Sequence, residues 1–361
     1  MTNVLAATHP EGTVYGEIGD ATVPLRFSAS PEALSEEYTA LRERAAVIDL
    51  GGHRLIEITG PAAVEFAQRV LARDVEYLTS DRCMMSLVLD EDGRIVDQVI
   101  AFGREDGILL ESSCGAGARL LEHLRARNDE GAEIADRSED LAIVGLEGPY
   151  AWGVVGRLID AELASLPFES VAEATWDGVD VVFARTGFTG EYGYQMIVPR
   201  ESAPGLWSLS VEHARPAGQE ALELAMLEVR QPMPRHEATP GASVIEIGAN
   251  WLVDITKESF VGREAVLEAF ESGAGRSTVG FTCAVGVPAP GTRLMAGDQV
   301  IGEVVHAVHS VGLNATLGLA RVDRDLAAAG LELSARRRRC HHAHQSLHRP
   351  QELERADHLI G

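Results

Sequence analysis

The sequence predicts an α+β protein of several domains that ends in an all-β domain. Its 361 residues exceed what one hydrophobic core usually supports, so two or three domains are expected. Residues 53–128 switch between strand patterns of period two and helix patterns of period 3.6. From Thr278 onward, short apolar runs are separated by Gly and Pro, which is typical of strands joined by tight turns.

The first elements are indicated by their end signals. Residues 31–47 are predicted to form a helix, because Ser30-Pro31 supplies an N-cap and a proline in the first turn. The alternating run over 53–59 predicts a strand, and the Gly-Pro pair that ends it opens a second helix over 62–75.

A β-hairpin is predicted over residues 86–103, where two apolar runs flank Glu91-Asp92-Gly93. Another strand at 107–113 and a helix at 118–128 follow. This order of paired strands and helices indicates a small sandwich in which helices cover one face of a sheet.

A second α+β unit begins near Asp140. Residues 141–149 repeat the strand and Gly-Pro pair seen at 55–61, which suggests a duplicated plan. Residues 179–199 read as a strand, a glycine-rich turn and another strand, and 220–230 as a helix. The glycine-containing stretch 271–277 is expected to link this unit to the β-rich ending.

The last 26 residues, 336–361, differ in composition from the rest of the chain. They hold six Arg against three acids, five of the twelve His, and no Val, Phe, Tyr or Trp. We expect a basic, disordered tail, with a nucleic-acid arm or a histidine metal site as less favoured alternatives.

Charge and composition exclude several classes of protein. The formal net charge of −24 disfavours nucleic acid and anionic membranes as partners. No apolar run reaches the roughly 18 residues of a membrane span, and the N-terminus lacks a signal-peptide pattern, so a cytoplasmic protein is expected. The four cysteines show no metal-ligand spacing, and no metal site is expected.

Several segments, in their order, resemble the glycine-cleavage T-protein (aminomethyltransferase) family of tetrahydrofolate enzymes. These segments are RAAVIDLGG at 44–52, ITGPAAVEFAQRVLARDV at 58–75, LDEDGRIVDQVI at 89–100, DRSEDLAIVGLEGP at 136–149, RTGFTGEYGY at 185–194 and WLVDITKESFVGREAV at 251–266. The resemblance spans about residues 31–333.

The resemblance implies three domains in a cloverleaf ring around a central ligand channel. The first, folate-binding-type domain would combine residues 1–50 and 140–270, and the second α+β domain would be the insert 51–139. The C-terminal β domain would be 276–335, followed by the tail at 336–361.

The family's acid-bearing segment matches Gly93-Arg94-Ile95-Val96-Asp97-Gln98, so the resemblance implies that Asp97 is the catalytic acid/base. The second acid of the family's pair is Gln98 here. A purely structural Asp at a strand end is the alternative. The glycines of 186–191 would let backbone approach a ligand, or would only form a tight hairpin.

Four further pocket positions depart from the family's residues. The family's Tyr-Ser reads Met85-Ser86, its Asn-Ala-Ala-Asn reads Ser112-Ser113-Cys114-Gly115, and the Arg on its helix is Met226. Gln195 stands where the family has an acid that accepts two parallel pterin N–H groups. We expect Met85, Gln98, Ser112, Gln195 and Met226 to line the tetrahydrofolate or substrate pocket.

The sequence therefore predicts a transferase that moves a methyl, methylene or aminomethyl group between a small-molecule substrate and tetrahydrofolate. Two alternatives remain open: a methyltransferase or demethylase of the same fold with another donor or acceptor, and a non-catalytic ligand-binding homologue. A carrier protein is a further partner that the resemblance leaves open.

Overall fold

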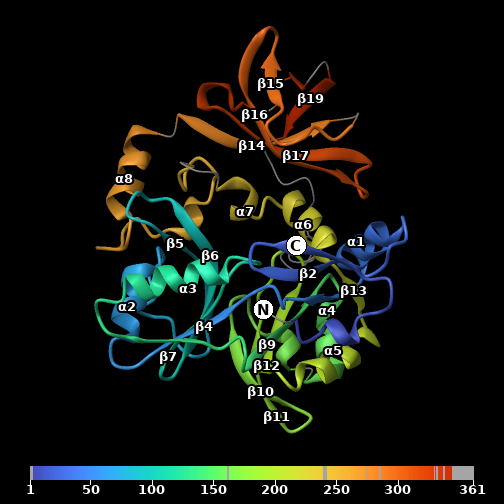
Figure 1. Ribbon diagram of the computed structural model, residues 1–361, viewed down its shortest axis with the longest axis vertical. Helices are drawn as coiled ribbons and strands as arrows, with labels where there is room; N and C mark the ends of the chain where they lie inside the picture. The colour runs from blue at the N-terminus through green and yellow to red at the C-terminus, as the bar shows by residue number, and fades with distance from the viewer. Residues whose placement is uncertain are drawn as a thin grey trace, which may run out of the picture.

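A computed structural model of the chain describes residues 3–343 apart from 161, 239–241, 274, 284–285, 329, 331 and 336–337. Figure 1 shows these residues as three lobes: a six-stranded sheet with its helices, a five-stranded sheet with its helices, and a closed β-barrel. The predicted α+β fold with an all-β C-terminal domain is confirmed.

The six-stranded sheet has the order β10-β11-β12-β9-β3-β13. Only β13 and β3 run parallel to each other. Its strands are β3 (Ala46–Asp49), β9 (Leu141–Glu147), β10 (Val171–Trp176), β11 (Val179–Ala184), β12 (Gly193–Pro199) and β13 (Arg215–Ala217). Its helices are α1 (Ala33–Glu43), α4 (Ala151–Leu158), α5 (Ala203–Val211) and α6 (Gln219–Glu228), beside the hairpin β1 (Val14–Ile18) and β2 (Ala21–Arg26).

Strand β9 lies in the middle of this sheet and is covered on both faces. Val144 and Leu146 pack in one core cluster with Trp207 of α5, whereas Ile143 packs in another with Leu222 of α6. A strand buried on both faces needs a continuous apolar run, which is the pattern LAIVGL in the sequence.

The five-stranded sheet is antiparallel, with the order β5-β6-β7-β4-β8. Its elements are β4 (Leu55–Thr59), α2 (Ala63–Val70), β5 (Cys83–Leu89), β6 (Ile95–Arg104), β7 (Gly107–Glu111), α3 (Gly117–Ala126) and β8 (Glu133–Asp136). Phe66 of α2 and Leu120 of α3 pack against one face of this sheet. The predicted hairpin is confirmed, with Gly93 at a φ of 71° in its turn.

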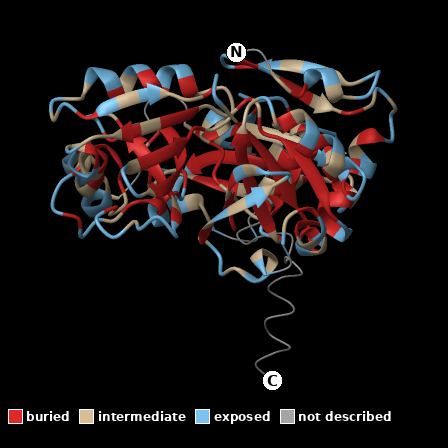
Figure 2. Cartoon of the chain, turned by 90° about the horizontal axis from the view of Figure 1, so that it is seen from below, coloured by how far each residue is buried: buried red, intermediate tan, exposed pale blue. Residues whose placement is uncertain are grey.

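The other face of the five-stranded sheet joins a core shared with the first sheet. Met85, Leu87 and Phe102 from this face lie in one cluster with Leu41 of α1 and Ala225 of α6. Figure 2 shows buried residues gathered along the strands and exposed residues on the outer faces of the helices. The two sheets are therefore held together by a common apolar interior.

Short elements connect these units to the barrel. They are the 3₁₀ turns Ala6–Thr8, Leu163–Ser165, Asn250–Leu252 and Arg324–Leu326, and the helices α7 (Pro234–Glu237) and α8 (Arg263–Ser272). No helix among the described residues is long and apolar enough to cross a membrane.

The C-terminal barrel closes in the order β14-β17-β16-β15-β18-β19. Its strands are β14 (Arg276–Cys283), β15 (Arg293–Ala296), β16 (Gln299–Ser310), β17 (Ala315–Asp323), β18 (Glu332–Ala335) and β19 (Arg338–Ala343). Phe281, Leu294 and Val304 pack in its interior.

Strand β19 corrects the expectation of a disordered tail from residue 336. Residues 338–343 pair with both β14 and β18, and this pairing leaves no open sheet edge in the barrel. The expectation is wrong for these residues, because backbone pairing does not require the apolar side chains that this segment lacks. Residues 344–361 lie outside the described residues.

The five-stranded sheet occurs in the chain between β3 and β9, which are neighbours in the six-stranded sheet. On this arrangement we propose the domain bounds 1–50 with 140–270 for the first unit and 51–139 for the insert. For the barrel we propose 276–335 together with the strand at 338–343.

Candidate functional site

A narrow pocket lies where the two sheets and α6 meet, with a cavity volume of about 70 Å³. Its wall combines residues far apart in the sequence. They are His53, Gln98–Ile100, Glu111–Cys114, Phe188, Gln219, Leu222, Glu223, Met226 and 232–235. A concave site at a domain junction that combines apolar surface with a few polar groups is where small ligands usually bind.

The structure brings some of the predicted pocket residues into this wall and places others behind it. Gln98, Ser112 and Met226 line the pocket. Met85 lies behind Gln98, whose Nε2 is 3.9 Å from the Met85 sulfur. Gln195 lies behind Glu111 and donates a hydrogen bond from Nε2 to Glu111 Oε1 at 3.3 Å.

Asp97 is fully buried behind the pocket wall and contacts two residues that line it, Ser113 and Gln98, whose backbone N–H donates to Asp97 Oδ1 at 2.9 Å. The Ser113 hydroxyl donates to Asp97 Oδ1, its backbone N–H donates to Oδ2 at 3.2 Å, and Ser113 itself lines the pocket. Burial raises the pKa of Asp97 to about 7, although the hydrogen bonds from Ser113 and the charge of Arg119 act in the opposite direction. A carboxyl group with such a pKa can both give and take a proton near neutral pH.

Ser112 has its hydroxyl committed to the backbone. It accepts a hydrogen bond from Arg54 N–H at 2.9 Å and donates to the Ser113 carbonyl at 3.1 Å. These bonds tie the end of β7 to the start of β4, and so hold the segment that carries Ser113 in place.

Two functional candidates were not found from the sequence: His53 and Glu111. His53 Nδ1 lies 2.7 Å from Glu111 Oε1, and their side chains are 8% and 1% exposed. Glu111 ends the otherwise apolar strand β7, and an acid in such a place is the one sequence signal that points to it.

Three buried acceptor atoms in and behind the pocket wall have no hydrogen-bond partner among the described residues. They are Gln98 Oε1, Glu111 Oε2 and Gln195 Oε1. Leaving a buried acceptor unpaired costs about 1–3 kcal/mol, so this cluster suits a ligand that brings several N–H donors.

Charged residues line the pocket on the α6 side. Glu223 pairs with Arg235, and its Oε2 lies 3.2 Å from His236 Nε2. Burial favours a raised pKa for Glu223, but the hydrogen bond with His236 and the charge of Arg235 lower it to about 2. Glu223 is therefore ionised and committed to its partners. The described residues hold no cluster of His, Cys, Asp and Glu that could bind a metal ion.

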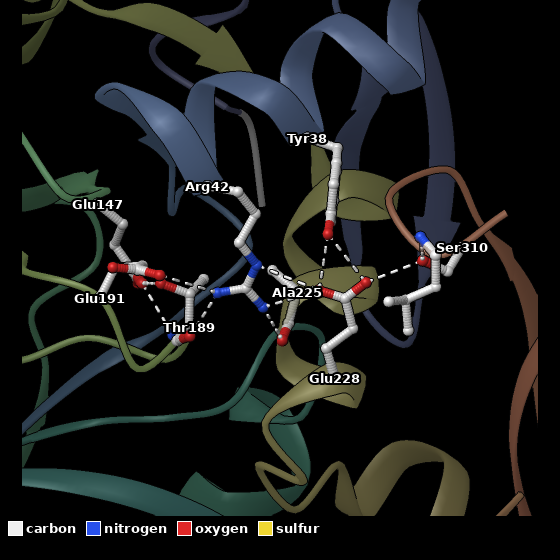
Figure 3. Close-up of polar contacts among 9 residues, drawn as sticks. Tyr38, Arg42, Glu147, Thr189, Glu191, Ala225, Glu228 and Ser310 are labelled. Atoms are coloured by element: carbon white, nitrogen blue, oxygen red, sulfur yellow. Dashed lines mark hydrogen bonds and ion pairs between the residues drawn. The ribbon is translucent and has the colours of Figure 1, made fainter. Parts of the chain in front are cut away.

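Figure 3 shows the buried polar network that positions the glycine-rich turn. Arg42 of α1 donates to Glu228 at 3.1 Å, to the Thr189 carbonyl at 2.8 Å and to the Ala225 carbonyl at 2.7 Å. Tyr38 and the barrel residue Ser310 also donate to Glu228, at 3.0 Å and 2.9 Å. Two of the three lobes, the six-stranded sheet with its helices and the barrel, contribute to this network.

On the other side of the turn, Glu147 at the end of β9 accepts hydrogen bonds from the backbone N–H groups of Phe188 and Thr189, both at 2.9 Å. A Cβ at Gly187 would lie 2.9 Å from the Gly193 Cα, so only glycine allows the two arms of the turn to approach this closely. The result is a fixed turn that presents Phe188 to the pocket.

Comparison with known proteins supports a single family. Residues 5–257 match the family model described as the GCVT N-terminal domain, and residues 276–350 match the glycine cleavage T-protein C-terminal barrel domain. The aminomethyltransferase of Streptomyces coelicolor is 31% identical over 342 residues, which cover 91% of each chain. That of Alkaliphilus oremlandii is 29% identical over 313 residues, covering 84% of this chain and 85% of the relative.

A solved structure has the same fold. The crystal structure of glycine cleavage system aminomethyltransferase T from Bartonella henselae superposes with a TM-score of 0.85 at 22% sequence identity, covering 95% of this chain and 96% of the other. The two family models together cover most of the chain, and the two relatives cover 91% and 84% of it. The resemblance noted in the sequence is confirmed, and the chain belongs to the glycine cleavage T-protein family.

Proposed function

We propose that this chain is an enzyme that moves a one-carbon unit, as a methyl, methylene or aminomethyl group, between a small-molecule substrate and tetrahydrofolate. Family membership and the relatives named aminomethyltransferase support this proposal. The pocket at the junction of the two sheets is the proposed site of the reaction.

The observation that carries the proposal is the cluster of unpartnered acceptors Gln98 Oε1, Glu111 Oε2 and Gln195 Oε1. The aminopyrimidinone edge of a reduced pterin offers several N–H donors, which is what buried acceptors require. Because Glu111 lies beside Gln195, the pocket retains a carboxylate near the position where the sequence shows an amide. The acceptor chemistry of these residues therefore supports this cofactor.

We propose that five predicted residues form the binding site together with Glu111. Gln98, Ser112 and Met226 would contact the ligand directly, whereas Met85 and Gln195 would support Gln98 and Glu111 from behind. Phe188 supplies an apolar face, held by the fixed glycine-rich turn.

Asp97 is the proposed acid/base group, and it would act through the Ser113 hydroxyl that separates it from the pocket. When bound, tetrahydrofolate supplies a secondary amine nitrogen that accepts the one-carbon unit. The transfer requires a proton to leave the accepting nitrogen and another to reach the departing donor atom. With a pKa of about 7, Asp97 can exchange a proton with Ser113 in either direction.

We further propose that the chain acts in the cytoplasm, where Cys83 and Cys114 would remain free thiols as they are in this structure. A carrier protein that presents the substrate is retained as a proposal that the family suggests.

Turnover with a panel of donors tests the proposed function. Tetrahydrofolate is incubated anaerobically with aminomethyl thiols, N-methyl amines, aryl methyl ethers and methyl sulfonium compounds, and the folate product is identified by mass spectrometry. Enzyme-dependent formation of 5-methyl- or 5,10-methylenetetrahydrofolate supports the proposal. Folate binding without turnover of any donor would indicate a non-catalytic homologue.

A further inference from the structure

His53 and Glu111 form a buried ionisable pair in the wall of the pocket. His53 lies in the turn after β3, where its N–H donates to the Leu50 carbonyl at 2.9 Å. Glu111 is the last residue of β7 and pairs in register with Leu55 on one side and Ile100 on the other. Strand pairing fixes the backbone of Glu111, a turn hydrogen bond holds that of His53, and the 2.7 Å contact joins the two positions.

The surroundings of the pair orient the imidazole. Glu111 Oε1 contacts His53 Nδ1 and also accepts the hydrogen bond from Gln195 Nε2. The Phe188 ring packs against the His53 ring, with centroids 5.9 Å apart. His53 Nδ1 lies at ion-pair distance from the carboxylate, although the two groups do not meet in hydrogen-bond geometry in this structure. His53 lines the pocket, so its other nitrogen, Nε2, is the candidate to meet a ligand. A carboxylate that fixes the tautomer and orientation of a histidine is the arrangement found in general-base catalysis.

Stability alone does not account for this pair. Burying two ionisable side chains costs desolvation free energy, and replacing such a pair by apolar residues of similar volume is often neutral or stabilising. Glu111 also keeps a second oxygen, Oε2, buried without a partner among the described residues. A buried ionisable pair in a cleft that stability alone does not explain is a candidate functional site.

The pair also complements Asp97. The Ser113 hydroxyl is the side-chain group that joins Asp97 to the pocket wall. Gln98, which lines the pocket directly, carries an amide that does not exchange a proton at neutral pH. A one-carbon transfer moves two protons, one from the accepting nitrogen and one to the donor atom. A second acid/base group on the pocket wall would allow each proton its own route.

We propose that His53, oriented by Glu111, is a catalytic acid/base residue of the pocket, and that Glu111 is its positioning residue. The inference rests on the proposed one-carbon transfer. As the new carbon–nitrogen bond forms, the proton of the accepting nitrogen passes to His53 Nε2. The bond from carbon to the donor atom breaks, its electron pair stays on the donor atom, and that atom takes a proton from the Asp97–Ser113 side. Exchange with solvent restores both groups.

The decisive variants are His53→Gln and His53→Asn, with the exposed His213→Gln as the matched control. The full-length variants are compared in melting temperature, in tetrahydrofolate affinity by anaerobic calorimetry, and in steady-state turnover with the best donor of the panel. We expect kcat to fall by roughly a hundredfold or more in both His53 variants, the scale of a lost general base, while Kd changes by less than about threefold.

Two further measurements separate proton transfer from a structural role. Added imidazole should restore part of the turnover of His53→Ala, because the deleted ring leaves space for it, and should not affect His213→Ala. Glu111→Gln keeps the shape of the side chain but removes its charge. Because Glu111 Oε2 is also a proposed acceptor for the ligand, folate affinity should fall, but kcat should fall by a larger factor. A loss of folate affinity with kcat unchanged would instead make Glu111 a ligand anchor and overturn its positioning role.

The outcomes distinguish this inference from the proposed function. If the wild type turns over a donor and His53→Gln retains more than half of the wild-type kcat, the inference is overturned and the proposed function remains intact. Absence of wild-type turnover with every donor contradicts the proposed function, and the inference falls with it. Loss of the folded state in both His53 variants would assign the pair to stability and would also overturn the inference.

Discussion

Gln195 of β12 donates a hydrogen bond from Nε2 to Oε1 of Glu111, the last residue of β7, at 3.3 Å. The amide at position 195 thus has a buried carboxylate as its neighbour, contributed by the other sheet. In the sequence alone, Gln195 looks like the loss of a family acid. In the structure, the acid of this part of the pocket is Glu111.

Gln195→Glu is expected to weaken the protein rather than improve its pocket. A second buried carboxylate beside Glu111 removes the hydrogen-bond donor and adds like-charge repulsion, so we expect a loss of about 1–3 kcal/mol in the free energy of unfolding. Tetrahydrofolate should bind no more tightly than to the wild type. Urea denaturation and anaerobic calorimetry measure the two effects.

The double variant Glu111→Gln with Gln195→Glu is the control, because it exchanges the amide and the carboxylate across the same contact. It should recover most of the lost stability, and the coupling is read from the double-mutant cycle. Tighter folate binding by Gln195→Glu alone would show that position 195, and not Glu111, faces the pterin.

Asp97→Asn should reduce kcat by roughly a hundredfold or more if Asp97 moves a proton through Ser113. Ser113→Ala tests the route, because removing the hydroxyl should lower turnover while leaving Asp97 in place. Unchanged turnover in a folded Asp97→Asn protein would make Asp97 a structural residue of β6.

Asp97→Asn should also change how the free energy of unfolding depends on pH. The pKa of Asp97 in the folded state, about 7, lies above the ordinary value of 3.8. The protonated carboxyl group therefore contributes its full stabilisation below about pH 4, and this contribution is lost as the pH rises through 7. Asn carries no charge at any pH. The melting temperature of Asp97→Asn relative to the wild type should therefore be higher at pH 8 than at pH 5. An equal difference at both values would contradict a raised pKa.

Glu228→Gln should be strongly destabilising, because Glu228 is the common acceptor for Arg42, Tyr38 and Ser310. Removing one partner of a buried ion pair costs about 3–5 kcal/mol. The variant should also raise the Kd for tetrahydrofolate, since Arg42 holds the turn that presents Phe188. Urea denaturation with the exposed Glu212→Gln as control checks this, and a loss below about 1 kcal/mol would show that the network is dispensable.

Truncation tests the corrected account of the C-terminus. A chain that ends at residue 335 lacks β19 and leaves the edges of β14 and β18 open, so the barrel should melt at a clearly lower temperature. A chain that ends at residue 350 keeps β19 and the matched part of the family model, and should melt within a few degrees of the full chain. Equal melting of both truncated chains would contradict a structural role for β19.

Local signals in the sequence were sufficient for most of the elements. The turn at Gly93, the helix after Ser30-Pro31 and the barrel strands after Thr278 each follow from periodicity and end signals within a short window. Strand β19 was missed because its Arg- and His-rich composition hides a segment whose pairing comes from backbone hydrogen bonds with distant strands.

The site was less accessible to sequence reasoning. The register of β5 and β6 shifts between Val88 and Leu89, and such a shift changes which residues face the pocket. The sequence pattern therefore does not distinguish Asp97 from Gln98 as the residue that faces the pocket. His53 and Glu111 are 58 positions apart and meet only through the pairing of β4 and β7. No local pattern encodes such a contact.

An anaerobic calorimetric titration of the full-length protein with tetrahydrofolate tests the central claim most directly. We expect saturable 1:1 binding with a Kd between about 1 μM and 1 mM, the usual range for enzyme substrates. Gln98→Leu removes a pocket acceptor and should lose at least about tenfold in affinity. If the wild type does not bind tetrahydrofolate at millimolar concentration, the proposed folate site is contradicted and this pocket serves another ligand.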